Sequence, residues 1–117
     1  MTIQHLQQRR AQIKAELLAL GAIHPGSISE QYNVCGTPGC RCKDPKHPEK
    51  HGPYYHLSYT WRGRSSTRFV RRSRVQVLRT KIGNYKRFRE LTAQWVDTEM
   101  AMEALERKAA SRADHGR

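Results

Sequence analysis

Residues 35–53 read CGTPGCRCKDPKHPEKHGP, and this stretch decides how the middle of the chain can fold. Four prolines and three glycines interrupt any regular element, and apart from the cysteines no side chain here can build a hydrophobic core. Such a segment is ordered only when it is cross-linked. All three cysteines of the chain lie in it, so we predict that a bound metal ion orders this loop.

The spacing of the cysteines predicts a zinc site. Cys35, Cys40 and Cys42 bring three thiols within eight residues, and structural zinc takes four sulfur or nitrogen ligands in a tetrahedron. An odd number of cysteines cannot pair completely within one chain. The N-terminus has no apolar run, so we expect no signal peptide, no membrane span and a reducing cytoplasmic location, where clustered thiols bind metal.

The fourth ligand is open among His47, His51 and His56. His51 ends the loop directly before Gly52–Pro53, and closing the whole loop stabilises more than closing half of it. This favours His51, while His47 lies inside the loop and His56 lies within an expected strand. We expect the zinc to be structural, because a catalytic zinc would leave one position open for water.

The flanking segments predict an α+β fold in a single zinc-containing domain over residues 1–107. Apolar residues at helical spacing predict a helix over residues 2–21 and a long helix over 74–107, which can form a coiled coil. Thr2 is the expected N-cap of the first helix. Residues 108–117 are expected to form a disordered basic tail.

Residues 27–72 are expected to hold the zinc loop and a small antiparallel sheet. Alternating apolar and polar residues predict strands from Tyr54 to Trp61 and from Ser65 to Val70, joined by a turn at Arg62-Gly63-Arg64. In this arrangement Phe69 points into the core. The hairpin then has one aromatic face and one opposite face that carries arginine.

The positive charge of the chain is concentrated after the cysteines. Lys and Arg total 22 against 10 Asp and Glu, and residues 41–74 hold a net charge of +8 out of +12, whereas 75–106 are balanced. Arginine suits forked contacts with phosphate, so this pattern predicts a nucleic-acid-binding surface beside the zinc loop. Its candidate contacts are Arg41, Lys43, Arg62, Arg64, Arg68, Arg71, Arg72 and Arg74.

The motifs CGTPGCRC at 35–42, HGPYYHLSY at 51–59 and NYKRFREL at 84–91 resemble those of a family of short uncharacterised prokaryotic proteins. The resemblance covers about residues 26–92. It implies ligand roles for Cys35, Cys40, Cys42 and His51, and thus supports His51 over His47. Members are often encoded beside transposases and other mobile-element genes, which implies an accessory role in handling nucleic acid.

These patterns favour a protein that is not an enzyme and that binds nucleic acid, double-stranded DNA first, alongside a transposase or recombinase. The alternative is a protein–protein adaptor acting through the long helix, which pairs with a partner, with a second copy in a homodimer, or with the N-terminal helix folded back. A metal-dependent nuclease is the third reading. It would depend on Asp44, Glu49 or His56, and no catalytic motif accompanies them.

Overall fold

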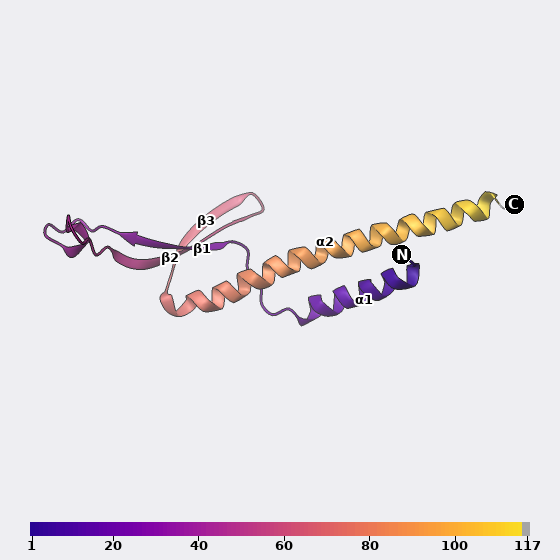
Figure 1. Ribbon diagram of the computed structural model, residues 1–117, viewed down its shortest axis with the longest axis horizontal. Coiled ribbons are helices and arrows are strands. Elements are labelled where there is room, and N and C mark those ends of the chain that lie inside the picture. The colour runs from indigo at the N-terminus through magenta and orange to yellow at the C-terminus, as the bar shows by residue number, and fades with distance from the viewer. Residues whose placement is uncertain (116–117) are drawn as a thin grey trace. The chain divides into compact units, whose positions relative to one another are not determined.

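The computed structural model describes residues 1–115 and has an α+β fold, as predicted (Figure 1). The elements are α1 (Ile3–Ala19), β1 (Ser27–Asn33), the short 3₁₀ helix η1 (Arg41–Lys43), β2 (His51–Trp61), β3 (Arg64–Val70) and α2 (Arg72–His115). The chain divides into two compact units, one of residues 24–83 and one in which residues 1–23 join the chain from Asn84 onward. That residues 1–107 act as one domain stays a prediction.

The unit of residues 24–83 is a three-stranded antiparallel sheet with β2 in the centre. Leu57, in the middle of β2, is fully buried and forms a hydrophobic core with Val70 of β3. Leu78 and Ile82 complete this core, so the first turns of α2 cover one face of the sheet. A sheet of this size is stable only when one face is covered in this way.

A two-residue turn at Arg62–Gly63 joins β2 to β3 and sets their register. Both residues have positive φ, 51° and 77°, as a type I′ turn requires. Trp61 therefore lies opposite Arg64, and each earlier residue of β2 follows in step. Residues that pair directly across two strands share one face of the sheet.

The prediction that Phe69 points into the core is wrong. A three-residue turn would pair Leu57 with Phe69, whereas the two-residue turn pairs Leu57 with Arg68. A shift of one residue sends every side chain of a strand to the other face. Val70 is accordingly 2% exposed and Phe69 57% exposed.

The predicted division into an aromatic face and an opposite arginine face is wrong for the same reason. Arg64 and Arg68 pair with Trp61 and Leu57, so they belong to the face that carries the core. Both arginines remain exposed because β3 is an edge strand. Their long side chains leave the sheet at its edge, where solvent is accessible.

In the other unit, α1 packs antiparallel against α2 beyond Asn84. Arg10 forms an ion pair with Glu99 at 2.9 Å, and Glu16 forms one with Arg87 at 3.2 Å, so the two helices run in opposite directions. The apolar residues buried in this unit come from both helices: Leu6, Ile13, Leu91 and Met102. The folded-back N-terminal helix thus covers much of the apolar stripe of α2.

The ends of the helices differ in part from the predicted bounds. Thr2 caps α1 as predicted, since its hydroxyl accepts a hydrogen bond from the His5 N–H at 3.2 Å. α2 begins at Arg72 and stays helical to His115, past the predicted end at 107, because its last turns are rich in helix-forming residues. The rest of the predicted tail, residues 116–117, lies outside the described residues.

Within residues 1–115 no helix combines the length and the apolar character that crossing a membrane requires.

We predict that Val70→Ala lowers the free energy of unfolding by about 1–3 kcal/mol, because it opens a cavity beside Leu57. Phe69→Ala should cost less than about 1 kcal/mol, because that ring is mostly exposed. Urea denaturation followed by circular dichroism measures both values. A larger loss for Phe69→Ala would contradict the register of the hairpin.

Candidate metal centre

Three segments of the sheet unit supply the donor atoms of a candidate metal centre. Cys35 lies just after β1, Cys40 and Cys42 lie at η1, and His51 is the first residue of β2. Asn33 of β1 pairs with His51, so the antiparallel ladder itself brings the end of β1 beside this histidine. The loop between them then folds back to present the other two cysteines.

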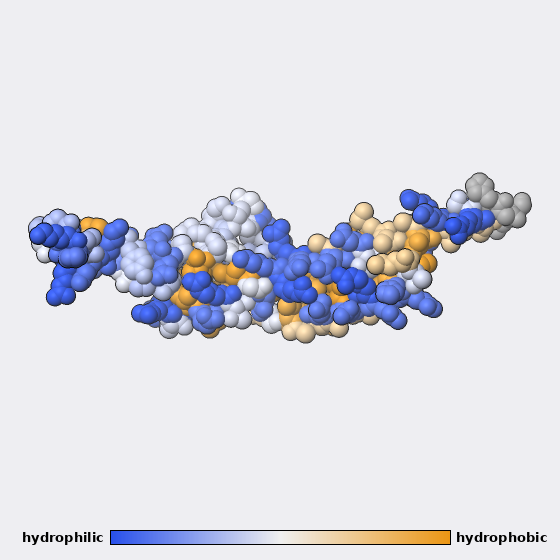
Figure 2. Space-filling model, viewed as in Figure 1, coloured by the Kyte–Doolittle hydropathy of each residue, from blue (hydrophilic) through white to orange (hydrophobic). Residues whose placement is uncertain are grey.

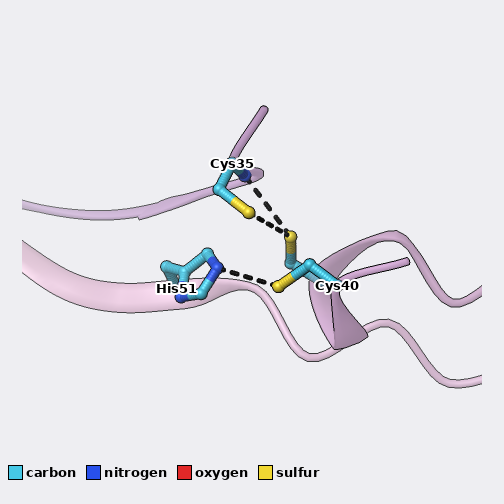
Figure 3. Close-up of side chains that lie close together, drawn as sticks. Cys35, Cys40 and His51 are labelled. Carbon is cyan, nitrogen blue, oxygen red and sulfur yellow. Dashed lines mark hydrogen bonds between the residues drawn. The ribbon is translucent and has the colours of Figure 1, made fainter. Parts of the chain in front are cut away.

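The four side chains converge on one point. One ligand atom from each of Cys35, Cys40, Cys42 and His51 lies within 4.8 Å of all the others. The sulfur atoms of Cys35 and Cys42 are 3.6 Å apart, and the Cys40 sulfur is 3.2 Å from Nε2 of His51 (Figure 3). Three thiols and an imidazole at these separations can hold a metal ion.

The backbone around the centre is arranged to hold these donors. The Lys43 N–H donates to the Cys40 carbonyl at 3.0 Å, which closes the η1 turn between two ligands. The Cys35 N–H donates to the Cys42 sulfur at 3.3 Å and helps to orient it. Only glycine fits after His51: Gly52 has a φ of 142°, and a Cβ there would lie 2.8 Å from the Gln31 carbonyl.

The sequence indicated only that the chain can turn at Gly52 after His51. The structure adds that the backbone there passes too close to Gln31 of β1 for a side chain to fit.

Hydrogen bonding makes two of the three thiols easier to ionise. The backbone N–H of Thr37, then contacts with Cys40 and His51, lowers the pKa of Cys35 to about 6. The backbone N–H of Cys42 lowers the pKa of Cys40. Burial instead raises the pKa of Cys42, and the neighbouring Cys35 and Cys40 sulfurs raise the pKa of His51. Since a metal binds thiolates, easy ionisation of two ligands favours its binding near neutral pH.

The structure places His47 and His56 outside this cluster. The His47 backbone N–H, together with that of Lys46, donates to the Asp44 carboxylate, and these bonds lower the pKa of Asp44. His56 lies in the middle of β2, with its ring centroid 6.2 Å from that of Phe69. The donor atoms that converge therefore include one histidine of the three candidates.

The predicted nucleic-acid contacts fall into two groups. Arg41 and Lys43 lie on η1 at the metal centre. The second group, which we call the arginine cluster, lies in the turn, on β3 and at the start of α2: Arg62, Arg64, Arg68, Arg71, Arg72 and Arg74.

The metal centre and the hairpin turn lie at opposite ends of β2. The strand runs from His51 to Trp61, and at about 3.3 Å per residue its ends are roughly 33 Å apart. Figure 1 shows the loop and the hairpin turn at its two ends. The expectation that the zinc loop lies beside the whole arginine-rich surface is therefore corrected for Arg62 and Arg64. An extended strand cannot bring its two ends together.

The arginine cluster has no acidic partner in residues 1–115. All six side chains belong to exposed residues, and none forms an ion pair, whereas Arg10, Arg41 and Arg87 each pair with a glutamate. The stretch from 62 to 74 contains no Asp or Glu at all. The first turn of α2 likewise has no acidic residue to balance the positive end of the helix dipole.

Comparison with known proteins places the chain in a family. The family described as Domain of unknown function (DUF6788) matches residues 3–80, and the chain belongs to this family. The match includes all four residues of the metal centre and confirms the expectation of an uncharacterised family. No curated protein and no solved structure matches the chain.

We predict that His51→Ala weakens binding of Co²⁺ by at least about tenfold, because it removes one donor from a converging set. Titration followed by the thiolate-to-cobalt absorption band measures the affinity. His47→Ala is the matched control, since it removes a histidine of the same loop that lies outside the cluster. Equal affinities for the two variants would contradict this ligand set.

Proposed function

We propose that this DUF6788 protein is a zinc-stabilised nucleic-acid-binding protein without catalytic activity. Its nucleic acid is double-stranded DNA, and its role is accessory to a transposase, a recombinase or other mobile-element machinery. The observation that carries the proposal is the arginine cluster, six exposed cations within thirteen residues that no carboxylate neutralises.

The chemistry of the donor set supports zinc as the metal. Zinc–sulfur bonds of about 2.3 Å in a tetrahedron place two sulfurs about 3.8 Å apart. The 3.6 Å between the sulfurs of Cys35 and Cys42 is close to this value. Four protein donors fill a tetrahedral zinc completely, which is typical of a structural site.

Unpaired arginines at the start of a helix favour an anionic ligand. Arg71, Arg72 and Arg74 flank the N-terminus of α2, whose own dipole is positive there. The repulsion among these positive charges raises the free energy of the unbound protein, and a phosphate group bound there would lower it. Arg64 and Arg68 extend the same cation-rich strand edge toward the hairpin turn.

The absence of catalysis is supported by the acidic residues of the loop, which already form hydrogen bonds or an ion pair within the loop. Asp44 accepts two backbone hydrogen bonds within its own turn, and Glu49 lies 3.8 Å from Arg41 as an exposed ion pair. A nuclease would need one of them as a general base beside the metal. Neither belongs to the donor cluster. We place the protein in the cytoplasm, where reducing conditions keep its thiols free for metal.

A second candidate function is an adaptor that docks a protein partner, or a second copy, on α2. Its supporting observation is an apolar pair that α1 leaves uncovered: Val96 is 57% and Met100 66% exposed, four residues apart on one helix. Figure 2 shows hydrophobic surface over this C-terminal half of α2. Such a surface can coexist with DNA binding at the arginine cluster.

We predict that the purified protein contains zinc and that removing it lowers the midpoint of thermal unfolding by at least about 5 °C, or roughly 1 kcal/mol. Cys40→Ser should lose the metal and show the same drop, whereas His47→Ala should keep both. Metal analysis and circular dichroism provide the two measurements. Full thermal stability without metal would contradict a structural role.

We predict that affinity for a DNA duplex of about 20 base pairs falls about 100-fold between 50 and 200 mM salt, because about four phosphate contacts release counterions. Arg64→Gln with Arg68→Gln should lower the salt slope by about two. Fluorescence anisotropy measures both.

The control for this experiment is Arg89→Gln with Arg112→Gln, which removes the same charge from exposed positions of α2 outside the cluster. An affinity that hardly responds to salt would contradict the proposed function. If the control variant loses as much of the salt dependence as the Arg64→Gln/Arg68→Gln variant, the arginine cluster is not the DNA-binding surface.

A further inference from the structure

The sheet has a second face, opposite Leu57, that no element of the unit of residues 24–83 covers. The register shows which residues belong to this face. Along β2 every second side chain points away from the Leu57 side, and the residues of β1 and β3 that pair with these positions point the same way. We call it the open face; its residues are Ser27, Ser29, Gln31, Tyr54, His56, Ser58, Thr60, Ser65, Thr67 and Phe69.

Three rings lie together on the open face. Phe69 is 57% exposed and Tyr54 36% exposed, although each is large enough to stabilise a core. The ring of His56 meets that of Phe69 edge to face, with centroids 6.2 Å apart and planes at 77°. This contact places the Phe69 ring of the edge strand beside His56 of the central strand. The hydrophobic core lies on the other face, so folding of the sheet does not explain the rings.

The charges around the open face indicate the kind of partner it fits. Glu30 is the one acidic residue of the three strands, and it pairs with Tyr55, on the core-bearing face. Cations stand at the rim instead: Arg62 in the hairpin turn at one end of β3, and Arg71 directly after the other end. A neutral surface of rings and hydroxyls between cations is complementary to a polyanion that carries flat rings.

The spacing of the rings distinguishes a single strand from a duplex. Phe69 pairs with His56, which lies two residues from Tyr54 on β2, so Tyr54 and Phe69 are diagonal neighbours about 7–8 Å apart. Bases in a duplex stack every 3.4 Å, with their faces covered by neighbouring bases. Only an unpaired strand can present its base faces to rings that stand this far apart.

We propose that the open face is a stacking platform for single-stranded DNA, in which bases lie on Phe69 and Tyr54 while the arginines at its rim, Arg62 and Arg71, hold phosphates. This rests on the proposed nucleic-acid-binding function and refines it: the arginines contact the backbone, and the open face takes unpaired bases. His56 is a positioning residue that fixes the ring of Phe69.

The test compares two aromatic residues of the same hairpin on opposite faces. The full-length chain and its variants are titrated into a fluorescein-labelled thymidine oligonucleotide of about 12 nucleotides, and into a duplex at the same salt concentration. Phe69→Ala and Tyr54→Ala should each weaken single-strand binding about five- to tenfold, since a stacked base is lost. Duplex binding should change less than about twofold. Trp61→Ala removes a ring of similar exposure from the core-bearing face and should leave single-strand binding unchanged.

A second measurement uses the unaltered protein and so does not depend on how the variants fold. Adding the oligonucleotide should shift the backbone amide resonances of His56, Thr67 and Phe69 more than those of Val96 and Met100. Equal losses for Phe69→Ala and Trp61→Ala, or shifts that avoid β2 and β3, would overturn the stacking platform. If duplex binding then keeps its steep salt dependence, the proposed function stands, whereas binding to neither nucleic acid refutes the proposed function itself.

Discussion

The two-residue turn at Arg62–Gly63 is the constraint on which the sheet depends. It decides that Leu57 pairs with Arg68, and therefore which side chains of both strands face α2. A turn longer by one residue would bury Phe69 and expose Val70. The same register puts the arginines of β3 on the core-bearing face, at its exposed edge, and leaves Phe69 on the open face beside Tyr54 and His56 of β2. The side of the sheet on which Arg64, Arg68 and Phe69 lie thus follows from the length of one turn.

The metal centre complements this turn at the other end of β2. The turn fastens β2 to β3, while Cys35 and His51 tie the end of β1 to the start of β2. Apart from its cysteines, the loop that joins β1 and β2 has one large apolar residue, Val34, which is 51% exposed, so hydrophobic burial cannot replace the cluster. The two ends of the central strand therefore differ: a tight turn fixes one end, and a cysteine–histidine cluster that could hold a metal lies at the other.

Much of the architecture was predictable because its signals are local. Thr2 indicates the start of α1, because the N-cap hydrogen bond joins residues only three positions apart. The three cysteines indicate a candidate metal centre, because they lie within eight residues of sequence. His51 was distinguishable from His47 only by loop closure and resemblance. The structure adds the reason, because pairing of Asn33 with His51 delivers that side chain to the end of β1.

By itself, the sequence determined the elements, the ligand types and the concentration of positive charge, because helical periodicity, cysteine spacing and composition are properties of neighbouring residues. Only the tertiary structure decided which face of the hairpin is buried, how far Arg41 lies from Arg62, and that α1 covers α2. These depend on register, strand length and the packing of distant segments. A change of one residue in a turn leaves the alternating pattern of both strands intact and yet reverses the face that Phe69 occupies.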